Sequence, residues 1–184
     1  NAAFTDPGEE INYDKTVVFD NEFCKLSVVK INDKAEGYDG QKFYTIYFEA
    51  VNKTDKKILF ELNESYFNGV YLKTSVLGFT VAGNSTEEAR LEYDYDDLAI
   101  FERYGLSDFT DIEMKMDILD VENNSSKLLA KERFNIYPYG EENAVVYDRA
   151  DENDIAVVSV DGVKVVAVGN YYTDELFVLD LFIC

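Results

Sequence analysis

The sequence predicts an all-β antiparallel sandwich with one short helix, followed by a partial second β module. Short runs of alternating apolar and polar residues follow one another along the chain, with Asn, Asp and Gly turn signals between them. The 14 Tyr and 13 Phe, with many Val and Ile, favour pleated sheet surfaces over helices. Many short strands with little helix are typical of a sandwich.

The strands of the first part are recognised by alternation. The clearest run is 43–51, in which Ile46 and Phe48 lie on one face. Asn68 and Gly69 both tolerate the positive φ angles of a two-residue hairpin, so we expect them to join the strands on either side. Strands are expected at 17–19, 24–31, 43–51, 58–62, 66–67, 70–72, 76–81 and 88–95.

Only one helix is expected, and it is brief. Asp96 or Asp97 can cap its first turn, Leu98 and Phe101 share a face, and Gly105 ends it. The strands after it continue the period of two, and Asp161-Gly162 is a second hairpin signal. These later strands are expected at 112–118, 128–136, 145–147, 155–160, 163–168 and 176–183.

The same alternation predicts which side chains form the core. Replacing one of the large ones, such as Phe48, should therefore destabilise the fold. The predicted core consists of Val18, Leu26, Val28, Ile46, Phe48, Leu91, Ile112, Met114 and Met116 or their immediate neighbours.

The chain is expected to have four parts. Residues 1–13 show no alternation of apolar and polar residues and are interpreted as a flexible tether. The sandwich is expected at 14–138, a linker at 139–144, and a partial repeat of the sandwich, made of β hairpins, at 145–184.

Three similarities support the repeat. The segment VVFD at 17–20 recurs as VVYD at 145–148, KLSV at 25–28 is similar to KVVA at 164–167, and the apolar strand at 43–50 is similar to 176–183. Half of a sandwich leaves an apolar face and a strand edge uncovered. We therefore expect residues 145–184 to pack against another surface and to form a homo-oligomer.

Charge excludes several partners. The chain has 17 Lys and Arg against 37 Asp and Glu, a formal net charge of −20. A negative field repels phosphate backbones and anionic lipid, so nucleic acid and direct membrane docking are not expected. The acids are spread along the chain, as they are in proteins whose charge serves solubility.

Catalytic chemistry has little support in the sequence. His is absent, which removes His-activated nucleophiles and imidazole metal ligands. No Gly-rich phosphate-binding motif occurs, so no catalytic residue and no cofactor are predicted. Cys24 and Cys184 are the two cysteines and both stand in apolar patterns, which leaves open whether they are buried thiols or one disulfide.

Taken together, the segments VVFD, FEAVNKTDKK, YFNGVYL, VAGNS and DLAIFERYGLSDFTDIEMKMDI resemble the immunoglobulin-like β-sandwich modules of secreted bacterial lipoproteins of the gut Gram-positive type. The resemblance covers roughly 14–138 and partly recurs from 145. It implies an immunoglobulin-like fold and a location outside the cell or in the cell envelope. Members carry a lipidated Cys near the mature N-terminus, so any membrane contact would use a lipid anchor absent from this chain.

Two groups of residues are weak candidates for a site. Tyr offers a rigid amphipathic surface for recognition, although Tyr at strand ends also covers sandwich rims. Clustered carboxylates could bind calcium, although these lack the order of an EF-hand loop. The ligand candidates are Tyr137, Tyr139, Tyr171 and Tyr172, and the metal candidates are Asp148, Asp151, Asn153 and Asp154.

The leading hypothesis is a non-catalytic interaction or spacer module with a protein or glycan partner. One alternative is a carboxylate-based hydrolase of an extracellular polymer, which a cleft holding two carboxylates of diverging pKa would favour. The other is a calcium-stiffened surface spacer, which a loss of thermal stability in EDTA would favour.

Overall fold

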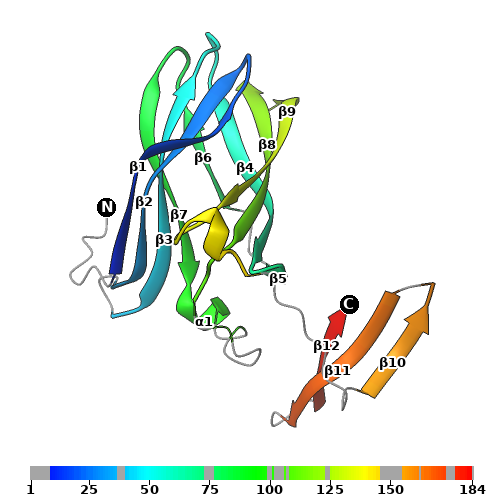
Figure 1. Ribbon diagram of the computed structural model, residues 1–184. Helices are drawn as coiled ribbons and strands as arrows, with labels where there is room; N and C mark the ends of the chain where they lie inside the picture. Colours follow the sequence, from blue (N-terminus) through cyan, green and yellow to red (C-terminus); the bar gives the residue numbers. More distant parts are fainter. Residues whose placement is uncertain are drawn as a thin grey trace. The chain divides into compact units, whose positions relative to one another are not determined.

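The computed structural model describes residues 9–36, 40–72, 77–98, 101, 106, 108–122, 125–145, 155–161, 163–172 and 177–183. The chain divides into two units, 1–146 and 147–184. In both units the described residues are predominantly β-strands (Figure 1).

The first sheet of unit 1 is antiparallel. It begins with a meander of β1 (Glu9–Asp20), β2 (Cys24–Glu36) and β3 (Lys42–Asn52). The free edge of β3 then pairs with β7 (Thr86–Asp94), so the strand order is β1-β2-β3-β7.

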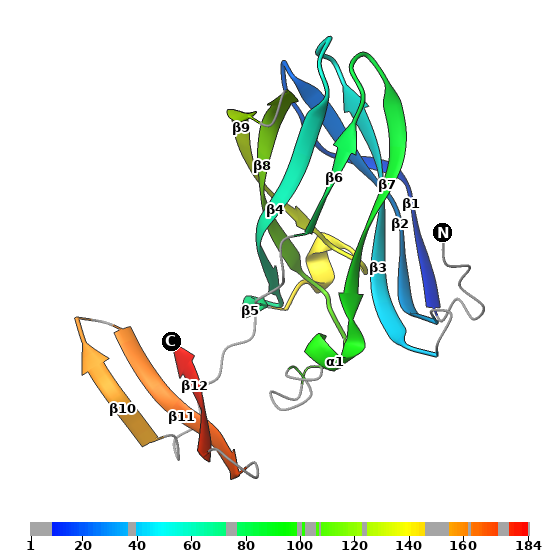
Figure 2. The same cartoon turned by 180° about the vertical axis from the view of Figure 1, so that it is seen from behind.

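The second sheet is built around β4 (Ile58–Phe67), β8 (Ile112–Glu122) and β9 (Ser125–Ile136). Both β5 (Val70–Leu72) and β6 (Leu77–Val81) pair with the other edge of β4. The chain therefore crosses between the sheets before β4, β7 and β8, and the two sheets face each other (Figures 1 and 2). The fold of unit 1 is an all-β sandwich, as predicted.

Aromatic rings fill much of the space between the sheets. Phe60 stacks on Phe79 with ring centroids 4.9 Å apart, and Phe48 stacks on Phe79 at 6.3 Å. At the end near α1 (Tyr95–Leu98), Phe67 lies at the centre of a second cluster. Its neighbours are Tyr44, Tyr93, Phe101 and Phe109.

The predicted core is confirmed at every position except Val18, which is half-buried. The β1–β2 register shifts between Val17 and Phe19, so Val18 is the extra residue of a β-bulge. Because a bulge changes the alternation of faces, the period of two fails at this residue.

The Asn68-Gly69 hairpin is confirmed, with φ of 49° and 80°. The Asn68 side chain is buried and also holds the segment before β8. Its Oδ1 accepts hydrogen bonds from the backbone of Thr110 and Asp111 at 2.8 and 3.0 Å, and its Nδ2 donates to the Asp108 carbonyl at 2.8 Å.

Asn52, which ends β3, has a similar role in the next turn. Its buried amide nitrogen donates to the carbonyls of Lys56, Val81 and Ala82 at 2.6, 3.1 and 3.0 Å. Its Oδ1 accepts from the Thr54 backbone at 2.9 Å. The side chain therefore joins the turn after β3 to the end of β6.

Three sequence predictions need correction. Residues 9–13 are not a tether, because β1 begins at Glu9 and pairs with β2. The predicted linker at 139–144 contains a 3₁₀ helix, Glu141–Asn143, and the unit boundary lies further on, after residue 146. The helix begins at Tyr95 rather than after Asp96 or Asp97.

The predicted strand at 145–147 is not observed at Val145, which lies outside any strand; residues 146 and 147 lie outside the described ranges. The Val145 backbone amide donates instead to Thr110 Oγ1 at 2.9 Å. This bond holds the end of unit 1 against the segment that precedes β8.

Unit 2 contains one antiparallel sheet of β10 (Ile155–Val160), β11 (Val163–Tyr172) and β12 (Phe177–Ile183), in that order. The predicted hairpin at 161–162 is present, because Val160 pairs with Val163 and Asp161 has φ of 48°. Within the ranges that the structure describes, no helix has the length and apolar character needed to cross a membrane.

Candidate functional site

The outer face of the second sheet carries a row of three ion pairs among the described residues. Along β8, Glu113, Lys115 and Asp117 alternate with buried Met and Ile side chains. The register places Lys115 between Glu64 of β4 and Arg133 of β9. We call this set the charge-paired face; it comprises Glu64, Tyr66, Asp111, Glu113, Lys115, Asp117, Lys131, Arg133 and Asn135.

Each cation of the charge-paired face contacts a carboxylate. Lys115 Nζ donates to Glu64 Oε2, and Arg133 Nη2 donates to Glu113 Oε2 at 2.6 Å. Lys131 Nζ lies 3.5 Å from Asp117 Oδ2. Exposed pairs of this kind add little stability, so their importance is in the charge pattern that they present to solvent.

Tyr66 connects the aromatic and charged parts of the face. Its hydroxyl donates to Glu64 Oε2 at 2.7 Å, and Lys115 Nζ lies 5.1 Å from the centre of its ring. Its ring also contacts that of Tyr71 on β5, at 5.4 Å. The hydrogen bonds from Lys115 and then Tyr66 lower the pKa of the Glu64 carboxyl, and the bond to Glu64 raises the pKa of Lys115.

Two adjoining hollows lie on the face, of about 380 and 350 Å³, and Lys115 and Arg133 line both. Each is lined by equal numbers of acids and bases. The first has Glu64, Asp117 and Glu132 with Lys115, Lys131 and Arg133; the second has Asp111 and Glu113 with Lys115 and Arg133.

A bulge opens the first hollow. The β4–β8 register shifts between Leu62 and Glu64, so Asn63 has no partner on β8, and its exposed side chain lines the hollow. Together with Asn135, which donates to Asp111 at 2.7 Å, it adds amide groups to the paired charges. The face can therefore form hydrogen bonds with a polar ligand at both ends.

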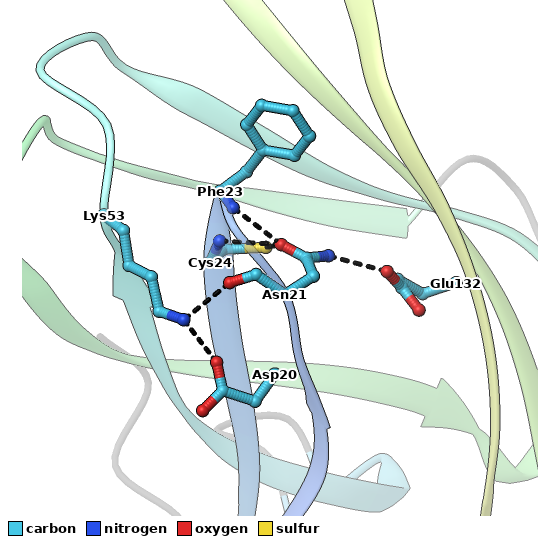
Figure 3. Close-up of polar contacts among 6 residues, drawn as sticks. All are labelled: Asp20, Asn21, Phe23, Cys24, Lys53 and Glu132. Carbon is cyan, nitrogen blue, oxygen red and sulfur yellow. Dashed lines mark hydrogen bonds and ion pairs between the residues drawn. The ribbon is translucent and has the colours of Figure 1, made fainter.

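A second polar cluster joins the two sheets at the β1–β9 edge (Figure 3). Asn21 Oδ1 accepts hydrogen bonds from the backbone amides of Phe23 and Cys24 at 2.8 and 2.9 Å. Asn21 Nδ2 donates across the sandwich to Glu132 Oε1 at 2.6 Å, and Lys53 Nζ donates to Asp20 and to the Asn21 carbonyl.

The only thiol in this cluster is unsuited to nucleophilic chemistry. Cys24 is fully buried and is a free thiol. Burial, and then the nearby Glu132 carboxylate, raise its pKa to about 12. Because the thiolate is the reactive form, Cys24 is a structural residue of the core at neutral pH.

The structure separates Tyr137 and Tyr139, the two predicted ligand residues that follow β9. Tyr137 follows β9 and lies beside the charge-paired face, where its pKa is raised by burial and then by Asp111. Tyr139 instead lies near Tyr13 and Tyr44, whose pKa values it helps to raise. Of the two, only Tyr137 lies near the charge-paired face.

The other predicted site residues belong to unit 2. Tyr171 and Tyr172 are on β11 of unit 2. Asp148, Asp151, Asn153 and Asp154 lie outside the described residues. Within the described ranges, no group of three or more Cys, Asp or Glu side chains is arranged to hold a metal ion.

Glu64, Lys131 and Arg133 were not predicted from the sequence as site residues. The alternation at 112–118 marked Glu113, Lys115 and Asp117 as one face, but their partners are on strands that are distant in sequence. Only the register shows that these side chains meet.

Comparison with known proteins adds one structural likeness. No protein-family model matches the chain, and no curated protein matches it. A solved structure described as a crystal structure of a protein from Archaeoglobus fulgidus matches with a TM-score of 0.34 and 11% identity, over 62% of this chain and 94% of that chain.

Proposed function

We propose that the protein is a non-catalytic interaction and spacer module that works outside the cell or in the cell envelope, and that the charge-paired face binds a polar partner. The observation that carries this proposal is the local charge balance. In a chain of net charge −20, the nine residues of the charge-paired face carry three bases and four carboxylates. The face is therefore close to neutral, so an uncharged but hydrogen-bonding surface can approach it without facing a strong negative field.

Among protein and glycan partners, we favour a neutral glycan. The hollows are lined mainly by charged and amide side chains, the ring of Tyr66 lines the second, and the ring of Tyr71 lies 5.4 Å from that of Tyr66. Aromatic rings beside amide and charged groups offer both an apolar surface and directional hydrogen bonds, the combination that a sugar ring needs.

The non-catalytic assignment is supported by the pKa values of two carboxyl groups. Glu10 and Glu64 both have lowered pKa values, caused first by hydrogen bonds from Lys30 and Lys115. A carboxyl that serves as a general acid in glycoside hydrolysis needs a raised pKa instead. Glu10 and Glu64 are therefore unsuited to the general-acid role.

We also infer an immunoglobulin-like topology. The pairings β2–β3–β7 and β4–β8–β9 correspond to strands A-B-E and C-F-G of that fold, with β1 added at one edge. A rigid sandwich suits a spacer that presents one face to a partner. The resemblance to secreted lipoprotein modules supports a location outside the cell or in the cell envelope.

The chain offers a matched pair of variants to test the binding face. Tyr66→Ala with Lys115→Ala removes a ring and the ammonium 5.1 Å above it. Tyr47→Ala with Lys30→Ala removes the same groups, at 4.9 Å, from the outer face of the first sheet. Both double variants lose comparable side chains, so a nonspecific effect would appear in both.

The measurement is binding to an array of neutral and acidic cell-surface polysaccharides, followed by calorimetry on the best binder. The intact protein and the Tyr47/Lys30 variant should bind equally, and the Tyr66/Lys115 variant should lose about tenfold or more in affinity, or about 1.4 kcal/mol. Equal binding by both variants would place the site elsewhere, and release of reducing sugar would show that the protein is an enzyme.

A further inference from the structure

The β10–β11 hairpin reproduces the pairing of the β1–β2 hairpin residue by residue. In unit 1, Val17 pairs with Ser27, Phe19 with Leu26 and Asp20 with Lys25. In unit 2, Ala156 pairs with Val166, Val158 with Val165 and Ser159 with Lys164. Every residue lies 139 positions after its counterpart (17 to 156, 27 to 166), and the bulge at Val18 recurs at Val157.

The next pairing is reproduced as well. Val28 pairs with Phe48 and Lys30 with Tyr47, which leaves Val29 as a bulge in β2. Ala167 pairs with Leu181 and Gly169 with Asp180, which leaves Val168 as a bulge in β11. Strand β12 lies 133 positions after β3 (48 to 181). Two bulges at equivalent places are specific features of a strand set, and chance pairing does not produce them.

This register corrects one similarity seen in the sequence. The strand equivalent to 17–20 is 156–159 and not the VVYD segment at 145–148. The other two similarities, 25–28 with 164–167 and 43–50 with 176–183, have the same offsets as the structure.

The equivalent positions differ in what covers them. In unit 1, Phe19 contacts Phe60 and Phe134 on the opposite sheet, Tyr44 contacts Phe67 and Phe109, and Phe48 contacts Phe79. Their counterparts in unit 2 are also apolar but are exposed. Val158 is 47% exposed, Phe177 55% and Leu181 47%.

The edge of the sheet is uncovered too. In unit 1 the far edge of β3 pairs antiparallel with β7 along 43–51. In unit 2, β12 is the last strand of its sheet among the described residues. A three-stranded sheet with one apolar face and an unpaired edge needs a second layer for stability.

We propose that unit 2 is the first layer of a second sandwich, and that it binds polypeptide equivalent to residues 52–145 of this chain. One strand of this partner pairs antiparallel with β12, as β7 does with β3. Its apolar sheet face covers Val158, Phe177 and Leu181, as β4, β6 and β9 cover Phe19 and Phe48 in unit 1.

A second copy of the chain fits this surface less well. In each copy the β4–β8–β9 sheet already packs on its own first sheet, so another copy offers only the same three-stranded layer. Each chain also has a net charge of −20, which opposes self-association.

In the test, the protein is extended after Cys184 by a segment that can form the proposed second layer. Residues 52–145 are added directly after Cys184, which corresponds to Val51, and a chain extended by a Gly/Ser segment of the same length is the control. Hydrogen exchange of the peptide 177–183 and fluorescence of the dye ANS are measured. We expect the 184-residue chain and the control to bind ANS and exchange this peptide quickly, and the extended chain to protect the peptide at least about tenfold and to lose ANS binding.

A second extended chain guards against imperfect packing of the added layer. In it, Val158→Phe, Phe177→Tyr and Leu181→Phe restore the inner side chains of unit 1. Fast exchange at 177–183 in both extended chains would overturn the proposal. So would a 184-residue chain that binds no ANS, because its face would already be covered. Light scattering measures the mass of the 184-residue chain in solution. If that chain is a dimer, and the double variant Phe177→Ser with Leu181→Ser is a monomer, then the surface binds a second copy of the chain and the proposal is overturned.

Discussion

At the scale of single residues, the fold raises the pKa values of several tyrosines that are buried or half-buried. Burial is the first cause that raises the pKa of Tyr13, Tyr44 and Tyr93. A raised pKa means that the unfolded chain releases these protons at lower pH than the folded chain. Their contribution to stability is therefore complete below the unfolded pKa of about 10 and is lost as pH rises above it.

We predict alkaline unfolding as a result. Tyr13, Tyr44 and Tyr93 should ionise only when the chain unfolds. The part of the tyrosinate absorbance that comes from them should therefore appear together with the loss of the circular dichroism of the strands, above about pH 10. Tyr93→Phe removes one such proton and should move the alkaline midpoint upward. Tyr71→Phe, at a ring that is 50% exposed, is the control. An unchanged midpoint in Tyr93→Phe would contradict the prediction.

The residue scale also shows where sequence reasoning ends. The Asn68-Gly69 pair predicted its turn because the φ requirement is local. It did not predict that the Asn68 side chain holds Thr110 and Asp111, since those partners are more than forty residues away. The local signal covers the backbone of the turn, and the long-range contact depends on how the sheets pack.

At the scale of elements, alternation predicted strands well wherever one face is buried and the other is exposed. It missed the start of β1, because Glu9–Tyr13 contains few apolar residues and is held by pairing with β2 instead. It failed at Val18 for the different reason that a bulge interrupts the period. The charge-paired face shows the same limit, since its strands were expected from the sequence but the side chains that meet across them were not.

Strand β3 is the element on which the first sheet depends, because it pairs on both edges with β2 and β7. Phe48 in its middle is fully buried against Phe79. We predict that Phe48→Ala lowers the free energy of unfolding of unit 1 by about 3–5 kcal/mol, through lost burial and the cavity left behind. Urea unfolding followed by circular dichroism measures this loss.

Leu181→Ala, at the equivalent place in β12, is the matched control. Its side chain is 47% exposed, so the unfolding of unit 1 should remain unchanged. A comparable loss in the two variants would mean that both side chains belong to one core.

At the scale of the whole molecule, the division into two units leads to a prediction about truncation. The turn at 141–143 and the bond from Val145 to Thr110 belong to unit 1, so the division lies after residue 146. A chain of residues 1–146 should fold as a monomer and keep the free energy of unfolding of unit 1 within about 0.5 kcal/mol. Light scattering measures the oligomeric state and urea unfolding the free energy of unfolding. A truncated chain that aggregates, or that unfolds without a cooperative transition, would contradict the prediction.

The buried amide of Asn52 limits how the protein can be produced. Asn52-Lys53-Thr54 matches the acceptor sequence for N-linked sugars, whose attachment point is the side-chain nitrogen of Asn. In the folded chain this nitrogen already donates to three backbone carbonyls and is closed to solvent. A sugar added there in a eukaryotic secretory host, before folding, would break the turn that joins β3 to β6. The exposed Asn84-Ser85-Thr86 could carry the same sugar in the folded protein. Production in such a host therefore calls for substitution of Thr54, which keeps the Asn52 amide unmodified at the cost of its own hydroxyl contacts.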